Sequence, residues 1–195
     1  MQEKINKLFN VKEIELFKSL IGKKFEKVRH DKFDFSNTSY RRVTLFVDGG
    51  TYELINDIEE IDFMWDDYGD EAVAVFKFEK TNDMGIDYNY GIDNYPKQIE
   101  NPINEVIQDI IIIEDNVKAF DKVTNNFVSE YDYVKGVIVV LDGFSYCFTR
   151  DIWFSEEIRI NKGENPQAKI GNIDDDWEWG EDRYSVNSRT FKKLN

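Results

Sequence analysis

The chain holds few of the residues on which most recognisable chemistry depends. Its 195 residues include one cysteine, Cys147, and one histidine, His30. A single cysteine excludes an intrachain disulfide, fits a reducing compartment, and together with a single histidine argues against a zinc site. Catalysis by His30 or Cys147 would require a nucleophile in contact with a base, and nothing in the spacing of the residues supports such a pair.

Phosphate-binding glycine loops and long apolar segments are also missing. Neither G-x-x-x-x-G-K-[ST] nor G-x-G-x-x-G occurs, so nucleotide binding by a standard glycine loop is not expected. The most apolar stretch, residues 106–117, is far too short to span a bilayer. Charges interrupt the first ten residues, unlike the apolar segment of a signal peptide. We therefore expect a cytosolic protein without a cofactor.

Positive charge is scarce. Lys and Arg number 25 against 39 Asp and Glu, which gives a net charge of −14 and a pI of about 4.6. A chain this acidic repels nucleic acid and anionic membranes, so direct binding to either is not expected. The simplest interpretation is a soluble acidic protein, and the acidity also favours a basic protein partner or a cation. Abundant Asn, Asp, Lys, Ile and Phe with only three prolines is typical of an AT-rich bacterial or phage genome.

Two stretches of the chain resemble each other. Residues 43–58 and 137–152 each carry an Asp-Gly pair, which suits a tight hairpin turn, between flanks of alternating apolar residues. At a constant offset of 94 they are identical at six of sixteen positions, and residues 23–28 match residues 118–123 at four of six. The residue preferences that all tight hairpins share explain the Asp-Gly pairs, but they do not explain the match between residues 23–28 and 118–123. We therefore predict an internal duplication.

The coarse pattern predicts a β-rich α+β fold. Apolar spacings of three and four over residues 11–21 predict an amphipathic helix that ends at Gly22, and most other periodic segments read as strands. We predict two tandem similar halves, residues 1–97 and 98–195, built on the Asp-Gly hairpins. The halves either fold separately or form one integrated domain that shares a sheet or core. Residues 81–101 are predicted to be the loop that joins them.

Two segments combine carboxylates with aromatic side chains, and they are the candidate partner-binding site. We assign to it Trp65, Asp66, Asp67, Tyr68, Asp174, Asp175, Asp176, Trp177 and Trp179. In a strand, the two tryptophans of the second segment would share one face. The simplest interpretation packs the tryptophans on the core and leaves the charges in water. A second is a face that binds a basic partner, and a third is a set of paired carboxylates for acid–base or metal-assisted hydrolysis.

A further acidic segment has a weak likeness to a calcium loop. Asp87, Asn89 and Asp93 stand at alternate positions, but Gly91 comes one position too early and Gln98 stands where an EF-hand has glutamate. We therefore expect a polar loop there and no metal site.

Three functional hypotheses follow. The leading one is a non-enzymatic binding protein of immunity or inhibitor type, whose acidic aromatic face mimics phosphate charge and occludes a basic nucleic-acid-processing enzyme. The alternative is a small-molecule or divalent-metal-binding protein, or a hydrolase, with a cleft between the halves lined by Asp66, Asp67, Glu156, Glu157 or Asp176. The third is a structural role in self-association through the hairpin edges.

Overall fold

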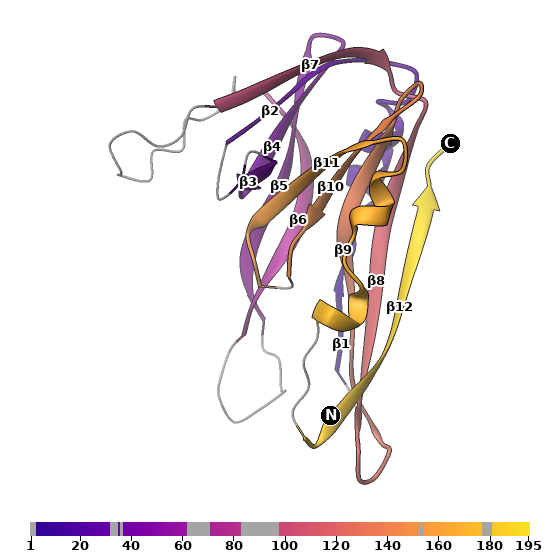
Figure 1. Cartoon of the computed structure of the whole chain (residues 1–195). Coiled ribbons are helices and arrows are strands. Elements are labelled where there is room, and N and C mark those ends of the chain that lie inside the picture. Colours follow the sequence, from indigo (N-terminus) through magenta and orange to yellow (C-terminus); the bar gives the residue numbers. More distant parts are fainter. Residues whose placement is uncertain are drawn as a thin grey trace.

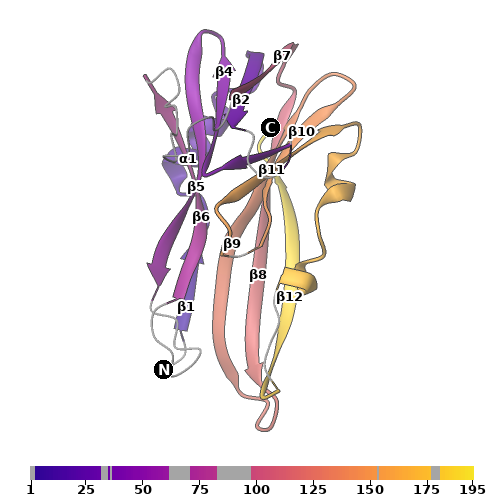
Figure 2. The ribbon, with the colours of Figure 1, turned by 60° about the vertical axis from the view of Figure 1, so that its left-hand side comes forward.

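The computed structural model describes residues 3–31, 35, 37–61, 71–82, 98–152, 154–176 and 181–195. These residues form twelve strands, one α-helix and two short 3-10 helices (Figures 1 and 2). The strands lie in two sheets, in which every pairing is antiparallel except that of β1 with β9. The predicted β-rich fold with little helix is therefore confirmed.

The smaller sheet contains five strands in the order β6-β5-β4-β2-β7. Their bounds are β2 (Lys24–Asp31), β4 (Arg42–Val47), β5 (Gly50–Ile61), β6 (Glu71–Thr81) and β7 (Gln98–Val106). Among the described strands, β6 pairs with β5 alone and stands at the end of the sheet order.

The larger sheet contains seven strands, of which six follow the order β12-β8-β9-β10-β11-β3. Their bounds are β3 (Thr38–Tyr40), β8 (Asp109–Asp121), β9 (Phe127–Val140), β10 (Ser145–Arg150), β11 (Glu157–Gly163) and β12 (Arg183–Lys193). The seventh strand, β1 (Glu3–Lys7), pairs in parallel with the first part of β9, beyond the stretch of β9 that pairs with β10.

Five strands of each sheet share one arrangement, apart from β3, which lies between β2 and β4 in the chain but joins the larger sheet. In the smaller sheet, β2, β4, β5, β6 and β7 are first to fifth along the chain, and across the sheet they lie in the order fourth, third, second, first, fifth. In the larger sheet, β8 to β12 are first to fifth along the chain and lie in the same order. The two stretches of similar sequence fall on equivalent hairpins, β4–β5 and β9–β10. β7 belongs to the smaller sheet although it follows residue 97, so the predicted boundary between halves stays a prediction.

One hydrophobic core joins the two sheets and the helix. It contains Phe25, Val43 and Leu54 from the smaller sheet and Ile112 and Phe148 from the larger. Its helical contribution comes from α1 (Val11–Lys18), whose Phe17 ring stacks on Phe78 of β6 at 3.7 Å between ring centroids. Side chains from both sheets and the helix are thus packed together in one core.

The helix begins and ends where local chemistry dictates. Asn10 caps it, since its side chain accepts hydrogen bonds from the N–H groups of Lys12 and Glu13, and the Glu13 carboxylate in turn accepts one from Asn10. The predicted helix is confirmed, although it ends at Lys18. Gly22 follows with φ of 82°, and its N–H donates to the Ile107 carbonyl at 2.8 Å.

The Asp-Gly hairpins are confirmed as turns. Asp48 and Gly49 have φ values of 46° and 70°, and Gly143 has φ of 73°. The positive φ at Gly49 and Gly143 favours glycine at both turns, and Asp48 shows that aspartate tolerates such a conformation in the first.

Candidate functional site

Residues next to the two acidic aromatic segments belong to one small apolar cluster. This cluster, here called the lower cluster, contains Val73, Val75, Val117, Tyr131, Tyr133 and Ile173, with Ile5 packed against it. Val73 lies near the start of β6, just after the first segment. Ile173 begins the 3-10 helix η2 (Ile173–Asp176), which enters the second segment. The chain beside each segment therefore contributes to the same apolar cluster.

Only part of the predicted partner-binding site can be placed. Asp174 and Asp175 lie on η2 and are exposed, and Asp176 ends that helix. The other six predicted residues, Trp65, Asp66, Asp67, Tyr68, Trp177 and Trp179, lie outside the described residues.

The described start of the second segment is a 3-10 turn, while Trp177 and Trp179, for which a shared strand face was considered, lie outside the described residues. Residues 173–176 form a 3-10 turn because Asn172 supplies local acceptors: its carbonyl accepts from Asp175 N–H at 3.2 Å, and its side chain accepts from Asp174 N–H at 3.4 Å. Such side-chain contacts compete with a strand ladder. The Asp174 carboxylate also accepts from the Asn187 amide at 2.8 Å, which ties η2 to β12.

Exposed carboxylates continue beyond η2 into the start of β12. Glu181 and Asp182 are both exposed, and 71% of the Asp182 side chain is accessible. We call the described residues Asp174, Asp175, Glu181 and Asp182 the acidic end. η2 and the start of β12 lie in the lower half of the molecule in Figure 1. All four residues are exposed, so they add negative charge to the surface there.

Two buried charged side chains, Asp115 and Arg150, contact Tyr133 of the lower cluster. Asp115, which is 1% exposed, receives two hydrogen bonds from Arg189, at 2.7 and 2.8 Å, and one from the Tyr133 hydroxyl at 3.1 Å. The Arg150 guanidinium stacks on the ring of Tyr133, with its central carbon 3.7 Å from the ring centroid. It also donates a hydrogen bond to the Ala74 carbonyl of β6. These contacts fix β6, β9, β10 and β12 relative to one another.

The two residues considered for nucleophilic catalysis are both buried and have structural surroundings. His30 lies on β2 with Nδ1 2.8 Å from the Asp31 carbonyl oxygen, and desolvation lowers its pKa. Cys147 lies on β10 in a separate apolar cluster with Ile113 and Ile138, and burial raises its pKa to about 12. A thiol that stays protonated at neutral pH is a poor nucleophile.

The carboxylates that line one cavity already pair with lysine or arginine side chains. A cavity of about 310 Å³ is lined in part by Glu114, Asp115, Glu130 and Asp132. Lys192 contacts Glu114 at 3.6 Å, Lys4 contacts Glu130 and Asp132 at 3.3 and 3.0 Å, and Arg189 holds Asp115. In the part of the chain that the structure describes, no group of three or more histidine, cysteine or acidic side chains is placed to hold a metal ion. Residues 83–97, which carry the calcium-like pattern, lie outside that part.

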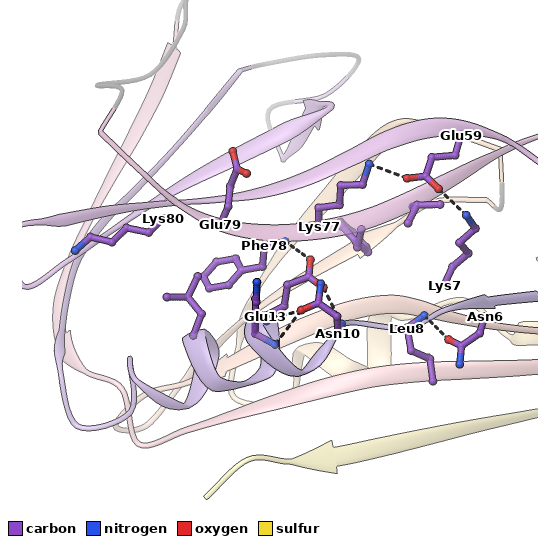
Figure 3. Close-up of a pocket in the computed structure, with 14 residues that line it drawn as sticks. Asn6, Lys7, Leu8, Asn10, Glu13, Glu59, Lys77, Phe78, Glu79 and Lys80 are labelled. Atoms are coloured by element: carbon purple, nitrogen blue, oxygen red, sulfur yellow. Dashed lines mark hydrogen bonds and ion pairs between the residues drawn. The ribbon is translucent and has the colours of Figure 1, made fainter.

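A larger groove of about 510 Å³ lies between β1, the start of α1, and β6 (Figure 3). Its walls are Asn6–Leu8 on one side and Val75–Lys80 on the other, and the first turn of α1 closes one end. Lys7 and Lys77 both bind the carboxylate of Glu59, at 2.6 and 2.7 Å, and these hydrogen bonds lower the pKa of Glu59. The sequence pattern did not point to this groove, because its two walls lie about seventy residues apart along the chain.

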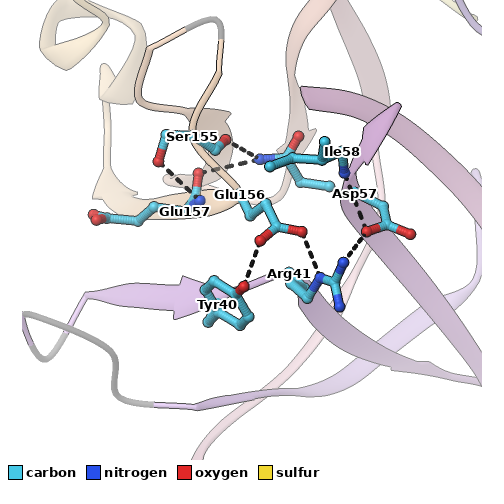
Figure 4. A network of polar contacts seen from close by, with 8 residues as sticks. Tyr40, Arg41, Asp57, Ile58, Ser155, Glu156 and Glu157 are labelled. Carbon is cyan, nitrogen blue, oxygen red and sulfur yellow. Dashed lines mark hydrogen bonds and ion pairs between the residues drawn. The ribbon is translucent and has the colours of Figure 1, made fainter. Parts of the chain in front are cut away.

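A polar network links the two sheets at the point where the chain crosses between them (Figure 4). Arg41, the single residue between β3 and β4, has φ of 65°, and its guanidinium binds Glu156, at 2.5 Å, and Asp57. Tyr40 donates to the same Glu156, and burial together with this carboxylate raises the pKa of Tyr40. Glu156, one of the residues suggested for a catalytic cleft, is thus occupied in joining the sheets.

Comparison with known proteins assigns no family. The chain matches no protein-family model, and neither a curated protein nor a solved structure resembles it significantly. Within the described ranges, no helix is both long and apolar enough to cross a membrane.

Proposed function

We propose that this protein is a cytosolic, non-enzymatic binding protein of immunity or inhibitor type, which engages a basic macromolecular partner. The proposed contact surface is the acidic end, with the two acidic aromatic segments as further contacts. The observation that carries the proposal is the lower cluster, in which Val73 beside the first segment and Ile173 beside the second share one apolar contact region. Residues that are distant in sequence can thereby contribute to one surface.

Charge supports this choice of partner. The chain carries −14 overall, and the described carboxylates at the acidic end are exposed. Complementary charge speeds encounter with a basic protein and disfavours nucleic acid as a direct ligand. Carboxylates spaced along a surface present the same sign of charge as a phosphate backbone, so the basic site of a nucleic-acid-processing enzyme is the partner surface that fits best.

The test is affinity capture from host lysate with matched charge variants. We expect Asp174→Lys with Asp175→Lys to reduce recovery of the specific partner by about tenfold or more, because it replaces attraction with repulsion at the contact. The control, Asp142→Lys with Glu164→Lys, makes the same change in net charge at exposed positions beside the β9–β10 turn and the end of β11. Equal recovery with both double variants would overturn the proposal.

We further infer that the two sheets derive from an internal duplication. The shared strand order and the similar β4–β5 and β9–β10 hairpins support this inference. Tyr52 and Tyr146, which occupy equivalent positions, are both buried in the main core. Asp57 and Asp151, also equivalent, both bind an arginine, Arg41 in the first case and Arg159 in the second.

A further inference from the structure

The ends of the two sheet orders are β6, β7, β3 and β12, and the first three are poor templates for a further strand. On β6, Phe78 N–H already donates to the Glu13 carboxylate. β7 carries Pro102, which has no N–H, and Asn104, which has φ of 59°. β3 has only three residues. Because an unpaired strand edge can accept another strand, β12 with its eleven residues is the end at which a sheet can extend.

The hydrogen bonds at the two ends of β12 show which of its backbone groups point away from β8. Lys122 N–H donates to the Asp182 carbonyl at 2.8 Å, and Leu194 N–H donates to the Ile110 carbonyl at 3.0 Å. The antiparallel register between β8 and β12 has no shift, so every even-numbered residue of β12 directs its backbone groups toward β8. The N–H and C=O groups of the odd-numbered residues therefore point outward.

The C-terminal part of this edge is open to solvent. Residues 190–193 are all exposed, and 47% of Phe191 is accessible. Figure 1 shows β12 as the outermost strand on its side of the larger sheet. In the part of the chain that the structure describes, no hydrogen bond engages the outward backbone groups of Phe191 or Lys193. The earlier part of β12 is more enclosed, because the Asn187 side chain holds η2.

The charge of β12 is opposite to that of the whole protein. The strand carries four lysine and arginine side chains and no carboxylate, whereas the chain carries −14. At its open end, Lys192 lies 3.6 Å from Glu114 with 53% of its side chain accessible, and Lys193 is exposed without an ion-pair partner among the described residues. Pairing with β12 of a second copy would place two cationic strands side by side, and like charges on adjacent strands repel. An acidic strand is the complementary occupant.

We propose that the open edge of β12 binds an extended acidic segment of a partner protein as an added antiparallel strand. The backbone groups of Phe191 and Lys193 hydrogen-bond to the segment, and the side chains of Lys192 and Lys193 contact its carboxylates. Seven residues opposite residues 188–194 span about 23 Å at the usual rise of a strand. The acidic end adjoins the other end of β12 and takes a basic partner, so this proposal stands independently of the function proposed above.

The test measures fluorescence polarisation of a labelled peptide with the sequence Thr-Glu-Glu-Val-Thr-Val-Thr. In the antiparallel arrangement its two glutamates lie opposite Lys193 and Lys192, and its first valine lies opposite Phe191. The second and fourth amides of the peptide then point toward β12, and the third and fifth point away. N-methylation of the second and fourth amides removes hydrogen bonds to the protein, whereas N-methylation of the third and fifth leaves them in place.

We expect N-methylation of the second and fourth amides to weaken binding by about tenfold or more, and N-methylation of the third and fifth to weaken it by less than about threefold. The basic analogue Thr-Lys-Lys-Val-Thr-Val-Thr should bind at least about tenfold more weakly than the acidic peptide. Failure of the acidic peptide to bind, equal effects of the two methylation patterns, or equal binding of the basic analogue would each overturn the proposal.

Backbone variants locate the site on β12. Phe191→Pro removes the outward N–H without removing a hydrogen bond to β8, and Phe191→Ala is the matched control that keeps this N–H. We expect the proline variant to bind the acidic peptide about tenfold more weakly than the alanine variant. Amide hydrogen exchange of Phe191 and Lys193 in the native protein should slow when the peptide is bound. Equal binding by the two variants, or unchanged exchange at these amides, would place the peptide elsewhere and refute the site.

Charge variants test the choice of an acidic segment. We expect Lys192→Glu with Lys193→Glu to weaken binding of the acidic peptide by about tenfold or more. The control is Lys12→Glu with Lys80→Glu, which makes the same change in net charge at exposed positions on α1 and β6 and should change binding by less than about twofold. Equal loss of binding in both double variants would contradict recognition by the lysines of β12.

Discussion

Among the described glycines, Gly136 has the least room for an added methyl group. A Cβ atom there would lie 2.3 Å from the Phe148 carbonyl oxygen and 2.7 Å from the Thr149 methyl carbon. Ordinary contacts begin at about 3.4 Å, so β9 and β10 would have to separate by about 1 Å. The affected pairs, Gly136 with Thr149 and Val137 with Phe148, lie beside the main core.

We expect Gly136→Ala to reduce the free energy of unfolding by about 2–3 kcal/mol, the usual cost of overpacking a rigid site. For a chain of this size, that corresponds to a fall in Tm of about 5–10 °C. Urea unfolding followed by far-UV circular dichroism measures the change. The slope of the free energy of unfolding against urea concentration should stay the same.

The control is Gly163→Ala, because no heavy atom lies within 4 Å of the Cβ position at Gly163 on β11. We expect it to change stability by less than about 0.5 kcal/mol, as is usual for surface substitutions. If the two variants unfolded at the same urea concentration, the close approach of β9 to β10 at Gly136 would be refuted.

Two further predictions concern buried titratable groups. Because burial raises the pKa of Cys147 to about 12, we expect the native thiol to resist Ellman's reagent at pH 8 and to react fully in guanidinium chloride; rapid native reaction would contradict this. Since an unfolded thiol ionises near pH 8.5, the contribution of Cys147 to stability should be complete below that pH and should fall as pH rises toward 12. For His30, desolvation lowers the folded-state pKa, so its contribution is present above about pH 6.5 and is lost as pH falls through the lowered value. Urea unfolding between pH 7 and 5 should therefore show a larger loss of stability for the native protein than for His30→Gln, and parallel losses would refute this assignment.

Local patterns were enough to predict the helix and both hairpins. The Asp-Gly turns require conformations that few residues adopt, and the helix carries an amphipathic pattern together with Gly22 beyond its end. These signals depend on neighbouring residues, so they can be read along the chain.

Contacts between distant residues could not be predicted in the same way. β3 has only three residues and joins the larger sheet although β4 belongs to the smaller, and the one residue between them, Arg41, has a conformation that its sequence does not announce. The pairing of β1 with β9 and the groove beside β6 also depend on tertiary packing. Sequence analysis identified Asp174 and Asp175 as candidates from their composition, but only the fold relates η2 to the start of β6.

Competition with nucleic acid tests the proposed function most directly. The captured partner is first bound to a labelled oligonucleotide, and the protein is then titrated into that complex while polarisation of the label is followed. Our account predicts release of the oligonucleotide at about one equivalent of the native protein, little release by Asp174→Lys with Asp175→Lys, and normal release by Asp142→Lys with Glu164→Lys. A stable ternary complex of protein, partner and oligonucleotide would contradict it.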